Sequence, residues 1–142
     1  MKQVFISYSG RDEFEASLLQ LTLEQLLEKE GVVAWTFQRD QERSEKEIAL
    51  SLKNHVRESA ASIFLVSPDT LESGASQWME LAYADAFDVR TFVLLHHLKF
   101  QDLKEATGVP PLLLSSQCNS AMEWKSVVED IGKLLKEQTG NA

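Results

Sequence analysis

Short apolar runs alternate with longer amphipathic stretches along the whole chain, and this alternation constrains the fold more than any other feature. The runs are rich in β-branched and aromatic residues and stop at turn residues, which is typical of strands. Between them, apolar residues recur at helical spacing, and Gly31 ends the first such stretch as a residue just past a helix does. Strands are therefore predicted at residues 4–8, 32–37, 61–66, 91–95 and 112–114. Helices are predicted at residues 12–30, around 48–56, at 77–88 and from 124 to 135, with a short helix or irregular turn at 100–107.

The repeated order of strand and helix predicts an α/β fold with a flavodoxin-like, five-stranded parallel sheet and helices on both faces. The near-continuous apolar strands agree, because a strand buried on both faces needs no polar alternation. Three helix starts have the serine-to-acid spacing of a capping box, namely Ser9–Asp12, Ser44–Glu47 and Ser120–Glu123. One domain is expected over residues 1–137, and the polar tail at 138–142 is expected to start a linker.

Charge and cysteine content limit the classes of partner. The 142 residues include 14 Lys and Arg against 22 Asp and Glu, so the formal net charge is −8. Nucleic-acid and anionic membrane surfaces are bound by clustered basic residues, so neither is an expected partner. A single cysteine, Cys118, excludes an internal disulfide and a cysteine-rich zinc site, and it fits a reducing compartment. Without a signal-peptide pattern or a long apolar run, the expected location is the cytoplasm.

In an open parallel α/β sheet, ligands bind outside the carboxyl ends of the strands. The residues at these positions exclude several known kinds of site. A phospho-acceptor receiver domain needs an acidic pair, an Asp and a Lys at places that here hold Tyr8-Ser9, Val66-Ser67 and Ser115. The glycine-rich motifs of dinucleotide and nucleoside triphosphate sites and the G-x-S-x-G nucleophile elbow are absent from the sequence. His96 and His97 are adjacent and, on a strand, would point to opposite faces, so no metal site is expected.

Several motifs resemble those of Toll/interleukin-1 receptor (TIR) domains, particularly the bacterial type. The run Val4-Phe5-Ile6-Ser7-Tyr8-Ser9-x-x-Asp12 resembles the first motif of the family, and residues 35–44 resemble its BB loop, with Arg39-Asp40 in the place of an Arg-Asp pair. Ser67-Pro68 followed by Ser76-x-Trp78-x-Glu80-Leu81-x-x-Ala84 is similar to the segment that carries the family's glutamate. Trp124 fits its C-terminal aromatic motif. The chain departs from the family by having no proline in the BB loop, Ser44 in place of the usual glycine, and a shorter Trp-to-Glu spacing.

The resemblance implies an activity. Many TIR domains cleave NAD⁺ between nicotinamide and ribose, and Glu80 matches their catalytic glutamate. Nicotinamide is a cationic leaving group, so this step needs a carboxylate that stabilises the oxocarbenium-like ribose rather than a general acid. NAD⁺ is expected as the substrate, with no cofactor, and the products are nicotinamide and either ADP-ribose or a cyclised product.

Further residues are expected around the substrate. A pyrophosphate would meet backbone N–H groups and the guanidinium of Arg11 where the first helix opens, and a base would stack on Phe37 at a strand end. Residues 73–76 are expected to form a flexible loop leading into the helix of Glu80. The expected substrate-binding residues are Tyr8, Ser9, Arg11, Phe37, Ser76 and Trp78.

The resemblance also implies partners. Arg39 and Asp40 are expected to contact other TIR domains in a homo-oligomer or filament, and a sensor domain or partner protein is expected to trigger a defence effector of this kind. Two alternatives stay open: a TIR interaction or scaffold module without turnover, and a nucleoside deoxyribosyltransferase-like enzyme, which also uses a glutamate on a glycosidic bond.

Overall fold

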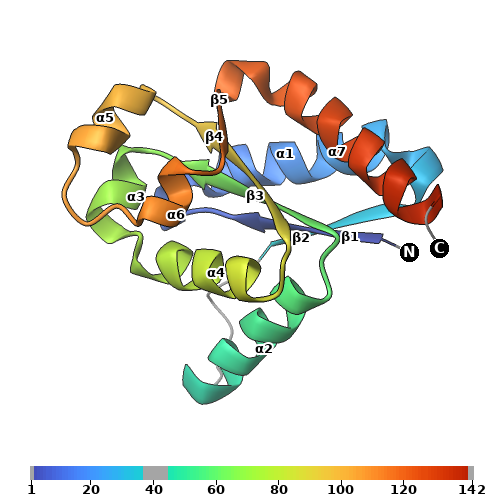
Figure 1. Cartoon of the computed structure of the whole chain (residues 1–142), viewed down its shortest axis with the longest axis horizontal. Coiled ribbons are helices and arrows are strands. Elements are labelled where there is room, and N and C mark those ends of the chain that lie inside the picture. The colour runs from blue at the N-terminus through green and yellow to red at the C-terminus, as the bar shows by residue number, and fades with distance from the viewer. Residues whose placement is uncertain (1, 37–44, 141–142) are drawn as a thin grey trace.

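A five-stranded parallel sheet lies between two layers of helices in this computed structural model, which describes residues 2–36 and 45–140 (Figure 1). The strands are β1 (Lys2–Ser7), β2 (Val32–Thr36), β3 (Ala61–Val66), β4 (Arg90–Leu95) and β5 (Gln117–Ser120). The helices are α1 (Glu13–Leu26), α2 (Glu45–Arg57), α3 (Pro68–Ser73), α4 (Ala75–Ala86), α5 (Phe100–Glu105), α6 (Pro111–Leu114) and α7 (Trp124–Gly140). Short 3₁₀ turns occupy Gly10–Asp12, Glu28–Glu30 and Ala121–Glu123. The predicted fold class is confirmed.

The order of the strands across the sheet is β2-β1-β3-β4-β5, and each neighbouring pair is parallel. The chain therefore goes from β1 to β2 on one side of β1 and later to β3 on the other side of β1. In the pairing of β1 with β3, Ile6 is in register with Ile63 and Ser7 with Phe64. This reversal puts the switch point of the sheet between β1 and β3. Ligands of such sheets bind beyond the carboxyl ends of the strands at the switch point.

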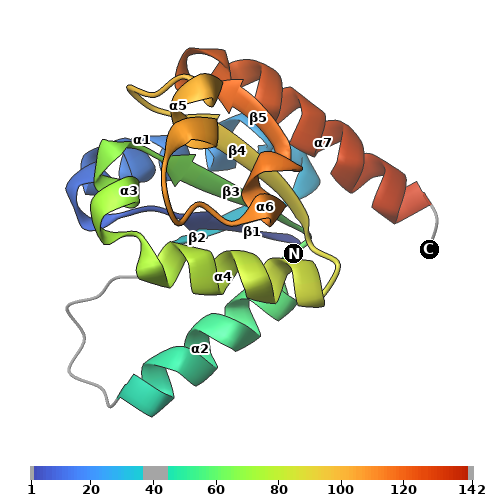
Figure 2. The same cartoon turned by 60° about the vertical axis from the view of Figure 1, so that its left-hand side comes forward.

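Each face of the sheet has its own apolar core, because successive strand residues point to opposite faces. Ile6 and Ile63 belong to the core beneath α1 and α7, whereas Phe5 and Phe64 belong to the clusters on the face of α2 and α4. The two views show α1 and α7 on one side of the sheet and α4 and α2 on the other (Figures 1 and 2). None of the helices in the described ranges is long and apolar enough to cross a membrane.

The fifth strand lies later in the chain than the sequence predicts. Leu112–Leu114, the predicted strand, belongs to α6, where Pro111 takes the first helical position and Leu113 is fully buried. Proline favours that position because its fixed φ suits a helix and its missing N–H would be unpaired there anyway. The observed strand, Gln117–Ser120, is a polar, half-exposed strand that pairs with β4 and forms the edge of the sheet within the described residues. Its sequence, Gln-Cys-Asn-Ser, has no apolar run, whereas the three leucines before it have the apolar character that predicts a buried strand.

The expected loop before α4 is also wrong, because the chain is helical on both sides of Gly74. Ser67 caps α3 with a capping box that involves Thr70, and Pro68 is the first helical residue. Gly74 alone separates α3 from α4, and a Cβ atom built on it would lie 2.2 Å from the carbonyl oxygen of Thr70. The backbone of Gly74 lies against that of Thr70, one turn earlier, so residues 73–76 form a tight corner between the two helices.

His55 makes the stability of the fold depend on pH. Its ring stacks on Trp35 with centroids 3.8 Å apart, and its Nδ1 has no hydrogen-bond partner among the described residues. Burial lowers the pKa of His55 below the usual 6.5, an effect that the nearby Glu58 carboxylate opposes. The unfolded chain then binds more protons just below pH 6.5 than the folded chain does. The contribution of His55 to the stability of the fold is therefore fully present above pH 6.5 and is lost as the pH falls through its lower folded pKa.

We expect His55→Phe to flatten this part of the pH dependence, because phenylalanine keeps a stacked ring that cannot take up a proton. The measurement is Tm between pH 7.5 and pH 5 for the wild type and the variant. His97→Asn, at an exposed position, is the control and should keep the wild-type slope. Equal slopes in the wild type and His55→Phe would assign the pH dependence to other groups.

Candidate functional site

Glu80 is buried at the carboxyl edge of the sheet, with 2% of its surface exposed. Acidic side chains are almost never this buried unless a polar partner compensates them. Here the Oγ of Ser7 donates a hydrogen bond to Oε2 of Glu80. Ser7 is the last residue of β1 and is itself buried, so the carboxylate is held at the end of the strand beside the switch point.

Contacts of α4 with the sheet bring Glu80 to this place. Leu81 and Ala84 are buried members of the apolar clusters on this face. Gln77, one turn before Glu80, is fully buried, and its Nε2 donates to the carbonyl oxygen of Leu65 at 3.0 Å. The helix is thereby anchored to β3 on the same side that carries the glutamate. This makes Glu80 a rigidly placed acid rather than a solvated helix residue.

A second buried acid, Asp12, lies at the same edge, with 6% of its surface exposed. The hydroxyls of Ser67 and Ser9 both donate hydrogen bonds to its Oδ2, and the bond from Ser9 is 3.0 Å long. The predicted capping box at Ser9–Asp12 is therefore wrong in its partners, because the serine hydroxyl binds the carboxylate instead of a backbone N–H. At Ser120–Glu123 the predicted capping box is confirmed.

Serines at the end of β1 and just after it therefore donate hydrogen bonds to two acids, which lie on two sides of the sheet. Ser7 binds Glu80 on the α4 side, and Ser9 binds Asp12 just before α1. Tyr8, between them, is half-buried and packs against the core of the α1 face. Of the predicted substrate-binding residues, Ser9 is buried in this network, and the roles of Ser9 and Tyr8 toward a substrate stay predictions.

Arg11 lies at the surface with 82% of its side chain exposed, and its Nε is 3.7 Å from Oδ1 of Asp69 in the first turn of α3. The backbone N–H of Arg11 donates to Oδ2 of the same carboxylate at 3.3 Å. An acid thus takes the place expected for a pyrophosphate. The role of Arg11 in binding phosphate stays a prediction, and it requires the phosphate to replace Asp69 at this N–H.

Ser76 and Trp78 lie on the same helix as Glu80, and each has a different position relative to it. Trp78 is half-buried and packs against the apolar cluster that contains Phe64 and Leu81. Ser76 lies four residues before Glu80, one turn away along the helix. Their roles in a ribose pocket stay predictions. Phe37, Arg39, Asp40 and Ser44 lie outside the described residues, and so does the predicted capping box that Ser44 would form with Glu47.

Asp12, Glu15 and His96, which the sequence patterns did not bring together, form a cluster whose ligand-type atoms all lie within 4.8 Å of one another. The reason given against a metal site was also wrong. His96 and His97 lie just past β4, where the backbone of His97 has a φ of 58°, and the two rings are 4.0 Å apart instead of on opposite faces. The i, i+3 spacing of Asp12 and Glu15 at a helix start was the available signal.

The fold and its buried acids define an open parallel α/β domain with a polar site at the carboxyl edge. The family model of the TIR domain matches residues 4–106, so the chain belongs to the TIR domain family. A search of curated proteins finds no match.

Solved structures support the same fold at low sequence identity. A 2-deoxyribosyltransferase from Leishmania mexicana is 15% identical over 94% of this chain and 98% of its own, with a TM-score of 0.67. The TIR domains of the activated Roq1 resistosome are 12% identical over 99% of both chains, with a TM-score of 0.55. A prokaryotic SEFIR domain is 12% identical over 95% of this chain and 92% of its own, also with a TM-score of 0.55.

Proposed function

We propose that this TIR domain is an NAD⁺ glycohydrolase that acts as a self-assembling defence effector. The observation that carries the proposal is the burial of Glu80 at the carboxyl edge of the sheet, with Ser7 donating to its carboxylate. A charge in this position costs folding free energy, and a purely structural site would be filled equally well by an apolar side chain. Its place at the switch point is where sheets of this type bind their ligands.

The chemistry suits a single carboxylate. When the bond between ribose C1′ and the nicotinamide nitrogen breaks, its electron pair stays on the nitrogen, and the ring leaves as neutral nicotinamide. Positive charge then develops on the ribose, and a carboxylate that faces it stabilises the transition state. Water captures the ribose to give ADP-ribose and a proton, or a nucleophile within the same molecule captures it to give a cyclised product. Ser7 acts as a positioning residue by holding Glu80 in one orientation.

Assembly belongs to the proposal because one of the similar structures comes from an assembly. The TIR domains with a TM-score of 0.55 to this chain are those of an activated resistosome. Other copies of this domain are the proposed partners, together with a sensor domain or sensor protein that triggers assembly. Mass action then makes activity per chain rise with protein concentration.

A second candidate function is nucleoside deoxyribosyl transfer. It is favoured by the similarity to the 2-deoxyribosyltransferase, which has a TM-score of 0.67. Both reactions break a bond between a sugar C1′ and a ring nitrogen, so a buried glutamate serves either. They differ in the leaving group, because an uncharged purine or pyrimidine needs protonation and nicotinamide does not.

The test is product formation by the wild-type chain from NAD⁺ and from 2′-deoxynucleosides, followed by chromatography over a range of protein concentrations and with a crowding agent. We expect nicotinamide from NAD⁺, with a rate per chain that rises with concentration, and no base exchange. Base exchange without nicotinamide release would support the deoxyribosyltransferase. Neither product, at concentrations where light scattering shows assembly, would support a scaffold without turnover.

A further inference from the structure

We propose that Asp12, Glu15 and His96 form a binding site for a zinc-like divalent transition-metal ion, separate from the Glu80 site. One carboxylate oxygen from each acid and one imidazole nitrogen lie within 4.8 Å of one another. Zinc bonds to such atoms are about 2.0–2.2 Å long, so each ligand atom has to move inward by less than about 1 Å. Side-chain rotation at Glu15 and His96, which are only half-buried, supplies that movement.

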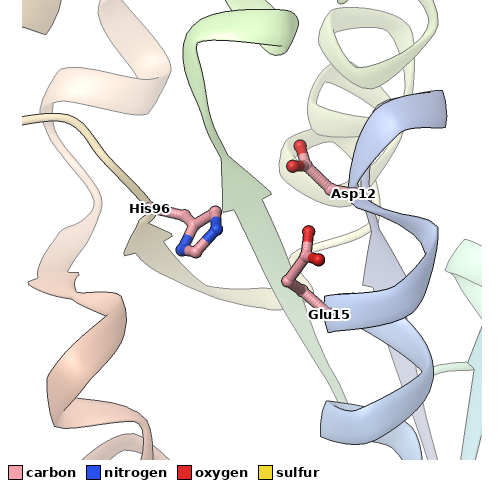
Figure 3. Close-up of side chains that lie close together, drawn as sticks. All are labelled: Asp12, Glu15 and His96. Atoms are coloured by element: carbon pink, nitrogen blue, oxygen red, sulfur yellow. The ribbon is translucent and has the colours of Figure 1, made fainter.

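Three separate pieces of local structure bring the ligands together (Figure 3). Asp12 ends the 3₁₀ turn after β1, and Glu15 lies in the first turn of α1, so their i, i+3 spacing puts both on one side of the helix start. His96 follows β4, and its backbone N–H donates to the carbonyl oxygen of Val66 at 2.8 Å, which fixes where its side chain begins. In the figure the three side chains point toward one another.

The hydrogen bonds that Asp12 accepts from neighbouring serines are of the kind that orient a metal-binding carboxylate. Metal-binding carboxylates are themselves held by hydrogen bonds, and these contacts orient them. Ser9 and Ser67 both donate to Oδ2 of Asp12, while Oδ1 accepts no hydrogen bond from the described part of the chain. Asp12 as a whole residue is 94% buried, at 6% exposure. A buried carboxylate held through one oxygen leaves the other for a ligand, and one carboxylate oxygen of Asp12 lies within 4.8 Å of the ligand-type atoms of Glu15 and His96.

The set of donors indicates the class of ion. Two carboxylates in so small a space repel each other, and a divalent cation compensates both charges. Imidazole suits zinc and other late transition metals, whereas magnesium and calcium prefer oxygen ligands alone. Three protein ligands also match an open zinc site, in which water takes the fourth position. Glu15 and His96 line a cavity of about 350 Å³, so the ion and its water have a route to the site.

The test is zinc binding to the purified full chain after treatment with a chelator, measured by calorimetry. We expect one Zn²⁺ per chain and a rise in Tm on addition of zinc. Glu15→Gln and His96→Asn should each weaken binding by at least about tenfold and remove the rise in Tm. Ser9→Ala, which removes one outer hydrogen bond, should weaken binding about tenfold.

Two matched controls separate the site from general surface binding. Glu13→Gln removes an exposed acid from the same turn of α1, and His97→Asn removes the neighbouring exposed histidine. Both should bind zinc like the wild type. The proposal is overturned if the wild type binds no zinc, if the control variants weaken binding as much as the site variants, or if millimolar Mg²⁺ or Ca²⁺ displaces the zinc.

Discussion

Replacing Glu80 with glutamine is expected to lower nicotinamide release from NAD⁺ by about 10²–10³-fold, the loss typical of removing one group that stabilises transition-state charge. Glutamine has nearly the same shape, and its carbonyl oxygen can still accept the hydrogen bond that Ser7 donates. The fold should therefore survive, with Tm within a few degrees of the wild type. The measurement is the initial rate of nicotinamide release at saturating NAD⁺, at a protein concentration where the wild type is active.

Two further variants sharpen this test. Asp85→Asn removes an exposed acid from the same helix and should keep the wild-type rate. Glu80→Ala should lose both activity and stability, because the buried Ser7 hydroxyl loses its partner, at a cost of about 1–3 kcal/mol. Full activity in Glu80→Gln would remove Glu80 from the reaction. A loss of activity in Asp85→Asn as large as in Glu80→Gln would point to a general effect of charge on α4.

Asp12→Ala is expected to be the most destabilising change at the carboxyl edge. The carboxylate accepts hydrogen bonds from Ser9 and Ser67, and all three residues are buried. Alanine leaves both hydroxyls without this partner and opens a gap between α1 and β3. We expect a loss of about 3 kcal/mol in the free energy of unfolding and a fall in Tm on the order of 10 °C.

The measurement is chemical and thermal unfolding in a buffer with chelator, so that loss of a bound metal does not contribute. Asp85→Ala, an exposed aspartate-to-alanine change, is the matched control and should stay within about 0.5 kcal/mol of the wild type. If Asp12→Ala is equally mild, then Asp12 does not hold α1 to β3. Activity measured on the same samples below Tm shows whether the network also supports the Glu80 site.

Most of the fold could be predicted because its strands and helices carry strong local patterns. The fully buried run of β3 and the leucine spacing of α1 leave little doubt about type or place. The errors fall where local pattern and tertiary environment disagree. An edge strand such as Gln117–Ser120 pairs with β4 along one side and needs no apolar run, whereas Leu113 and Leu114 pack into an apolar cluster from a helix.

The candidate site could be predicted only in part. The acid on α4 stood out because Glu80 lies in an otherwise apolar stretch and matches a family motif. Its partner Ser7 did not, since nothing local shows that β1 and α4 meet at this point. In the sequence, Asp12 has the spacing of a capping-box acid, and His96 is one of two adjacent histidines at a strand end. Their convergence depends on which strands are neighbours at the carboxyl edge, which is a property of the sheet topology.

The first strand and the last helix run close together at the edge of the sheet opposite the acids. Nζ of Lys2 donates to the carbonyl oxygen of Leu135 at 2.6 Å, and α7 continues only to Gly140, about 8 Å further along its axis. A host protein, a surface tether or an assembly scaffold attached at this edge would leave the carboxyl ends of the strands facing outward.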